Sequence, residues 1–148
     1  MAPLHKHTYP YKYPPPYRLM ARRGENLDGV PQQPMLPVRL NGMNFEALLD
    51  SGATYILIPK EIALKLGLPL YEKTTGKGVS GRFEEFRTDV DLTIGSGPKE
   101  DHIGKIVAYV PEAPNLDIPI LIGQHPIFDI YKIVFEKYLE KFHLIPKE

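Results

Sequence analysis

The chain has 148 residues, no cysteine, and 18 basic against 18 acidic side chains, so its formal net charge is zero. This length suits one domain with a hydrophobic core, and the balanced charge makes nucleic acid an unlikely partner. The missing cysteines exclude disulfide bonds and thiol catalysis. No apolar run approaches the roughly 20 residues of a membrane span, and the first residues lack a signal-peptide core. We expect a soluble cytoplasmic protein with no membrane partner, and the 16 prolines and 12 glycines favour a mainly β fold with many turns.

Residues 1–34 differ in composition from the rest of the chain. Tyrosines alternate with prolines, as in Tyr9-Pro10 and Tyr13-Pro14, and the segment before Glu25 carries basic but no acidic residues. Proline lacks an amide proton and restricts the backbone, so regular structure is not expected there. We predict a flexible basic arm over residues 1–34 and a single domain over residues 35–148. An arm that docks a partner or nucleic acid is the less favoured alternative.

Two apolar runs, residues 36–40 and 43–49, are joined by Asn41-Gly42. Asn-Gly between apolar strands is the strongest short signal of a β-hairpin, because both residues tolerate the positive φ of a type I′ turn. The second run ends directly on Asp50-Ser51-Gly52, and another apolar run begins at Tyr55. Asp, Ser and Gly also form ordinary turns, but an ordinary turn acid is seldom flanked by two apolar strands. The pattern predicts a carboxylate presented from rigid backbone.

A short helix is predicted after Pro59, with Ile62, Ala63 and Leu66 on one face and Gly67 at its end. Its role is structural.

A glycine-rich segment follows, in which Gly76, Gly78 and Gly81 surround Val79 and Ser80. Glycines at this density favour a mobile turn, and the alternating apolar residues of 83–94 predict a long strand after it. The segment therefore predicts the tip of a hairpin. This hairpin either acts on a bound ligand or is a plain surface hairpin without such a role.

The last third of the chain contains a predicted strand at residues 103–110, a proline-rich loop, and the apolar run Ile120-Leu121-Ile122-Gly123. A continuous apolar strand is usually buried on both faces. A second short helix is predicted over residues 126–130, and a final hairpin from residues 131–136 and 141–146. His125, next to the helix, is expected to make structural hydrogen bonds.

These residues resemble a known family. Asp50-Ser51-Gly52-Ala53 after an apolar strand looks like the active-site motif of retropepsin-like aspartic proteases. Ile120-Leu121-Ile122-Gly123 resembles the second signature of that family, and residues 59–68 resemble the segment after the motif in cellular and microbial members. The resemblance covers residues 35–146 and implies a single-domain closed β-barrel or sandwich with one or two short helices and a flap hairpin.

The resemblance also implies roles for particular residues. Asp50 would be catalytic, braced by Ser51 and Gly52, and the apolar run would support this loop from behind. The residues implied in substrate binding are Ala53, Thr54, Gly76, Gly78, Val79, Ser80 and Gly81, and those implied in support are Ile120, Leu121, Ile122 and Gly123. Gln124 departs from the pattern, because the family often has an arginine after this glycine. The resemblance therefore does not extend to the subunit contacts that this arginine makes.

The chain supplies only one Asp-Ser-Gly, whereas peptide hydrolysis of this kind needs two carboxylates around one water. The resemblance therefore implies a homodimer that cleaves a peptide or protein substrate, with no metal and no cofactor. A catalytically silent module that dimerises or binds peptides is the alternative, and a nucleic-acid binder acting through its basic arm comes third. Tyr9-Pro10 and Tyr13-Pro14 also raise the hypothesis that the protein cleaves its own N-terminal segment. The alternative is that tyrosine and proline stand next to each other there by chance, because both are abundant in this segment.

Overall fold

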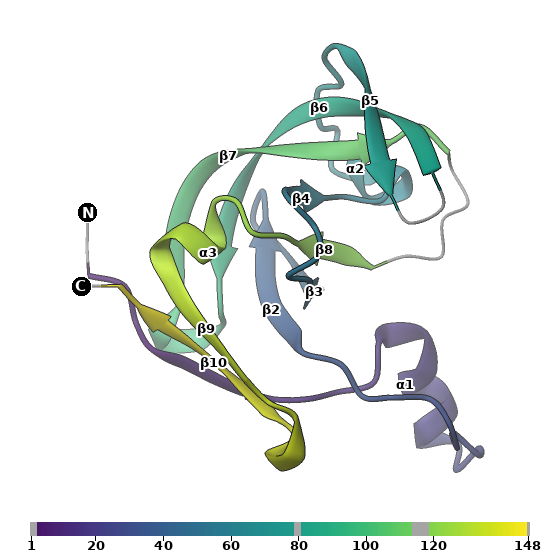
Figure 1. Ribbon diagram of the computed structural model, residues 1–148, viewed down its shortest axis with the longest axis vertical. Coiled ribbons are helices and arrows are strands. Elements are labelled where there is room, and N and C mark those ends of the chain that lie inside the picture. Colours follow the sequence, from purple (N-terminus) through teal and green to yellow (C-terminus); the bar gives the residue numbers. More distant parts are fainter. Residues whose placement is uncertain (1–2, 79–80, 114–118, 148) are drawn as a thin grey trace.

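The computed structural model describes residues 3–78, 81–113 and 119–147, and its fold is mainly β (Figure 1). Seven strands are hydrogen-bonded in the order β2-β3-β8-β4-β7-β6-β5, and a further pairing of β2 with β6 closes six of them into a barrel. β5 lies outside this ring and pairs with β6. The predicted closed barrel is confirmed. Its strands are β2 (Met35–Leu40), β3 (Met43–Leu49), β4 (Ile56–Leu57), β5 (Lys73–Gly78), β6 (Gly81–Ile94), β7 (Asp101–Pro111) and β8 (Ile120–Ile122).

The hairpin of β2 and β3 forms as predicted. Asn41 and Gly42 have φ values of 49° and 82°, the left-handed conformation that these residue types tolerate best. The Asn41 side chain also accepts a hydrogen bond of 2.9 Å from the N–H of Asp91, which ties the turn to β6. The register set by this turn places Ala47 and Leu49 in the core, so the alternate residues of β3 face outward.

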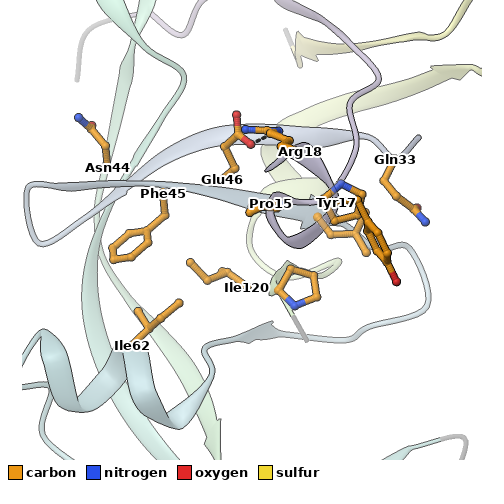
Figure 2. A pocket seen from close by; sticks show the side chains of 12 residues that line it. Pro15, Tyr17, Arg18, Gln33, Asn44, Phe45, Glu46, Ile62 and Ile120 are labelled. Carbon is orange, nitrogen blue, oxygen red and sulfur yellow. Dashed lines mark ion pairs between the residues drawn. The ribbon is translucent and has the colours of Figure 1, made fainter. Parts of the chain in front are cut away.

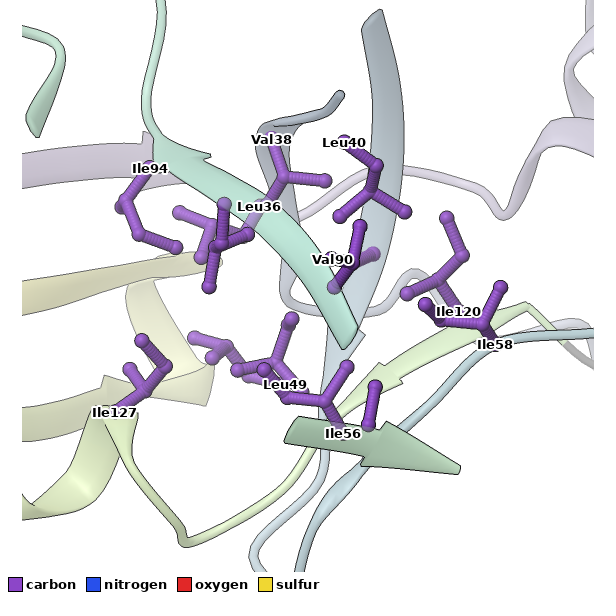
Figure 3. Packing of buried hydrophobic residues seen from close by; sticks show 14 of the residues in the cluster. Leu36, Val38, Leu40, Leu49, Ile56, Ile58, Val90, Ile94, Ile120 and Ile127 are labelled. Atoms are coloured by element: carbon purple, nitrogen blue, oxygen red, sulfur yellow. The ribbon is translucent and has the colours of Figure 1, made fainter. Parts of the chain in front are cut away.

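Branched aliphatic side chains fill the barrel (Figure 3). Full burial of one such side chain stabilises the folded state by roughly 1.5–3 kcal/mol. Ile120 and Ile122, predicted as core from their apolar run, are both buried. β8 is thus a packed strand and gives the neighbouring end of β3 a rigid support. The labelled members of the cluster are Leu36, Val38, Leu40, Leu49, Ile56, Ile58, Val90, Ile94, Ile120 and Ile127.

The described residues also contain three short α-helices and two 3₁₀ turns. They are α1 (Pro15–Arg22), α2 (Lys60–Lys65), α3 (Ile127–Ile130), η1 (Gly97–Lys99) and η2 (Lys137–Leu139). α2 follows Pro59 and is closed by Gly67, whose φ is 64°, as the sequence predicts. α3 also lies where a helix was predicted, whereas the sequence did not predict α1. In the described part of the chain, no helix has the length and apolar character needed to cross a membrane.

A second sheet is built from both ends of the chain. β9 (Tyr131–Glu136) and β10 (Lys141–Pro146) form the predicted final hairpin, and β1 (His7–Pro10) pairs antiparallel with β10. The predicted lack of regular structure in the N-terminal segment is therefore wrong. Pro10 is tolerated because β1 is an edge strand, where one amide proton is not needed. Tyr11 follows β1 into the core. The boundary between residues 34 and 35 stays a prediction.

A buried network holds the N-terminal strand to the barrel. His7 is 3% exposed, and its Nε2 lies 2.8 Å from Oδ2 of the buried Asp101. Tyr131 donates to the same oxygen at 2.5 Å, and the His5 backbone N–H donates to the carboxylate at 3.0 Å. Burial alone would raise the pKa of Asp101, but the hydrogen bonds from Tyr131, His7 and His5 outweigh it and lower that pKa. Burial and the Asp101 carboxylate raise the pKa of Tyr131.

Candidate active site

Asp50 stands at the end of β3, next to β8. The two strands run parallel, with Leu48 opposite Leu121 and Leu49 opposite Ile122. The N–H of Asp50 continues this ladder by donating to the carbonyl of Ile122 at 3.0 Å. Because β8 is packed in the core, the backbone of Asp50 is held by a buried strand.

The turn after Asp50 is closed by the aspartate itself. The N–H of Gly52 donates to Oδ1 of Asp50 at 2.9 Å, and the N–H of Ala53 donates to the Asp50 carbonyl at 3.1 Å. A Cβ on residue 52 would lie 3.2 Å from Oδ1, tighter than an ordinary contact. Glycine at this position therefore lets the carboxylate fold over the turn, and the hydrogen bond orients it.

Gly123 lies behind this turn and touches its backbone. A Cβ at residue 123 would come within 2.3 Å of the Tyr55 carbonyl oxygen and 2.6 Å of the Ala53 carbonyl oxygen. No side chain fits at such distances. The next two N–H groups then donate to the turn, from Gln124 to Ala53 at 2.9 Å and from His125 to Thr54 at 2.8 Å. Gly123 thus allows the segment after β8 to clamp the Asp50 turn.

Gln124 adds a contact that the sequence reasoning did not find. Its Nε2 donates to the carbonyl of Ser51 at 2.7 Å, so both its side chain and its backbone hold the turn. The sequence showed only that an amide stands where the family often has an arginine, and no local pattern indicates which carbonyl that amide meets. His125 contacts Asp129, with 2.6 Å between Nδ1 and Oδ2.

The structure therefore brings together seven of the predicted site residues: Asp50, Ser51, Gly52, Ala53, Thr54, Ile122 and Gly123. Ile120 and Leu121 support them from within β8. The predicted flap falls on β5 and β6, which pair up to Gly78 and Gly81, and Figure 1 shows this hairpin at the rim of the barrel. Val79 and Ser80 lie outside the described residues.

The glycine within β5 lies close to side chains of β6. A Cβ on Gly76 would lie 2.8 Å from Oε1 of Glu85 and 3.0 Å from the Phe83 ring across the strand pair. Burial raises the pKa of the Glu85 carboxyl. Across the described residues, no group of three or more histidine or acidic side chains is arranged to hold a metal ion.

Comparison with known proteins places this geometry in a family. A family model described as aspartyl protease matches residues 36–125. A solved structure of a retropepsin-like aspartic protease from Rickettsia conorii is similar, with 18% identity, a TM-score of 0.57, and coverage of 97% of this chain and 96% of that chain. EIAV protease complexed with the inhibitor HBY-793 also matches, with 27% identity, a TM-score of 0.49, and coverage of 70% and 90%.

No curated protein sequence matches this chain. The Rickettsia structure supports the fold, and the family match spans more than half of the 148 residues and includes the Asp50 turn, β8 and Gly123. The chain belongs to the aspartyl protease family, and its barrel is retropepsin-like.

Proposed function

We propose that this protein is an aspartic endopeptidase that acts as a homodimer, with one Asp50 from each subunit at the shared site. The observation that carries the proposal is the position of Asp50. It is the chain's single aspartate followed by Ser-Gly, and it stands on a turn that β8 holds through backbone hydrogen bonds. A carboxylate held in this way is suited to chemistry that depends on accurate placement.

The proposed reaction needs two carboxyl groups in different protonation states around one water. The ionised one takes a proton from the water as it attacks the peptide carbonyl, and the protonated one donates to the carbonyl oxygen. Two close carboxylates cannot both ionise readily, so the pair shares one proton and titrates as a unit. A dimer with Asp50 on its twofold axis supplies this pair. No metal or organic cofactor is part of the proposal.

The other predicted site residues have distinct roles in this proposal. Ser51 and Gly52 brace the aspartate, and Ala53 and Thr54 bind substrate backbone beside it. The β5–β6 hairpin, with Gly76, Gly78, Val79, Ser80 and Gly81 near its tip, closes over an extended peptide by main-chain hydrogen bonding.

The terminal hairpin is proposed as part of the dimer interface. Phe135, Tyr138 and Leu139 are large apolar side chains that remain exposed near its turn, and Tyr138 is 82% exposed. A second copy would cover them, since aromatic side chains are enriched in interfaces. Self-processing stays a hypothesis. Tyr9-Pro10 lies within β1, so this bond could enter a cleft only after β1 leaves β10.

The test is cleavage of a peptide library by the wild type and by Asp50→Asn, a nearly isosteric change. We expect the variant to keep its fold and dimer but to lose cleavage. Asp91→Asn is the matched control, because Asp91 is an exposed carboxylate on β6 that pairs with His102. Activity of Asp50→Asn close to that of the wild type would refute the proposal. A wild type that binds peptides without cleaving any would instead identify a silent module.

A further inference from the structure

A cavity of about 730 Å³ lies between α1 and the edge of the barrel. Figure 2 shows Phe45 and Ile62 at one end, Ile120 and Pro15 in the middle, and Tyr17 and Gln33 toward the other end. Most of its lining is apolar, and its charged members are Arg18 and Glu46.

This cavity lies beside the candidate active site along the chain. Leu48 lines it from β3 and stands two residues before Asp50, which directly follows that strand. Residues two apart in extended backbone lie about 7 Å from each other. Pro119, which also lines the cavity, directly precedes β8. A peptide bond held at Asp50 would therefore have a neighbouring side chain within reach of the cavity.

α1 is held over the cavity by polar contacts to β3. Arg18 makes an ion pair with Glu46, and the side chains of the two residues are 29% and 19% exposed. Nε of Arg18 also donates to the carbonyl of Tyr13 at 3.0 Å, which fixes the start of the helix. Before the helix, Lys12 and Gln33 exchange two backbone hydrogen bonds of 2.9 and 2.7 Å. The N-terminal segment is therefore anchored on both sides of Pro14 and Pro15.

These contacts decide what the cavity can hold. Its cation and its anion are paired with each other, so neither is left to attract a charged ligand. The remaining walls are mainly proline rings, two aromatic rings and aliphatic side chains. An occupant that keeps the ion pair and buries apolar surface is favoured over a polar one.

We propose that α1 is a specificity element of the protease. Pro15 and Tyr17 close a pocket that receives an apolar side chain of the substrate beside the cleaved bond. The ion pair of Arg18 with Glu46 sets the width of this pocket by holding α1 in place. This role rests on the proposed endopeptidase function, and it assigns to the N-terminal segment a part in substrate choice.

Changing Tyr17 in two directions tests the pocket wall. Tyr17 is 38% exposed, so its replacement leaves the core intact. With a peptide library, Tyr17→Ala should raise kcat/KM for large aromatic residues relative to leucine by about tenfold at one substrate position, and Tyr17→Trp should lower it. Leu19→Ala is the matched control, because Leu19 lies on the same helix, is 51% exposed and does not line the cavity. Identical preferences in all four proteins would overturn the proposal.

A charge swap tests the ion pair. Glu46→Arg alone puts like charges together, so it should displace α1 and flatten the size preference. Nζ of Lys12 also lies 3.5 Å from Oε1 of Glu46, so this charge is exchanged as well. The triple variant Glu46→Arg with Arg18→Glu and Lys12→Glu restores opposite charges and should recover the wild-type preference. A flattened preference that the triple variant fails to recover would show that the pair does not set the pocket.

A binding measurement separates this inference from the proposed function. Asp50→Asn is titrated with a peptide series that differs in one apolar residue, with and without Tyr17→Ala. If the affinity depends on the size of the apolar residue and Tyr17→Ala changes this dependence, the pocket is supported. A wild type that cleaves nothing would then refute only the endopeptidase function. If Tyr17→Ala leaves the affinities unchanged, the pocket is refuted even in an active enzyme.

Discussion

The Asp50 turn and the N-terminal segment differ in how much of their structure is signalled by neighbouring residues in the sequence. The turn directly follows β3, and its apolar flanks and glycine are visible in one short stretch of sequence. The N-terminal strand instead pairs His7 with Leu144 and Tyr9 with Phe142. A proline-rich stretch with distant partners looks irregular when read locally. Composition thus describes the local preference of a segment, whereas a tertiary partner decides its structure.

The largest effect is expected from Gly123→Ala, on the side of the Asp50 turn. The added Cβ would lie 2.3 Å from the backbone oxygen of Tyr55, and backbone cannot move aside without opening the turn. We expect a loss of roughly 3–5 kcal/mol in the free energy of unfolding, measured by denaturant titration. Gly104→Ala is the control, because its φ of 98° is strained while the space around it is open. Equal losses in both variants would contradict the role given to the close approach.

Tyr11→Ala tests whether the N-terminal segment belongs to the core. The Tyr11 ring meets the Phe142 ring edge-on, with 6.0 Å between the ring centroids. The backbone N–H of Tyr11 donates to the Glu140 carbonyl at 2.7 Å. Removing this buried ring should cost about 3 kcal/mol in the free energy of unfolding. Leu64→Ala, at a side chain on α2 that is 63% exposed, should change it by less than about 0.5 kcal/mol. Similar values for the two variants would mean that the segment is a loose extension.

Asp101→Asn tests the network that holds β1. Losing the charged acceptor of Tyr131 and His7 should cost about 2 kcal/mol near neutral pH. The pKa of Asp101 is lowered in the folded protein, so this stabilisation is present above the unfolded pKa of about 3.9 and is lost as the pH falls through the folded value. Thermal melts at several pH values should show the gap between wild type and variant narrowing below about pH 4. A gap that widens in acid would contradict this account.

Gln124→Ala should have the smallest effect. It removes one hydrogen bond to the Ser51 carbonyl, which is worth about 1 kcal/mol in the free energy of unfolding. Gln124→Glu keeps the shape but lacks the N–H donor, so it should lose at least as much. Wild-type stability of Gln124→Glu in denaturant titrations would show that the contact contributes nothing.

Much of the barrel was predictable because its signals are local. Asn41-Gly42 and the alternation of β3 sufficed for the first hairpin, and the apolar run of β8 sufficed for a buried strand. β1 could not be predicted, since its hydrogen bonds go to β10 and Pro10 argues against a strand in isolation. The Gln124 contact also escaped prediction, because an amide side chain carries no signal of its direction.

The pairing of β1 with β10 has a consequence for how the protein is made. Residues 7–10 leave the ribosome well before their partners at residues 141–144. At about 5–20 residues per second, the interval is on the order of ten seconds. During that time Tyr9 and Tyr11 have no strand to cover them, and the sheet forms only by closing a very long loop. Such long-range closure is slow, so this nascent segment stays exposed to chaperones and to aggregation until β10 emerges.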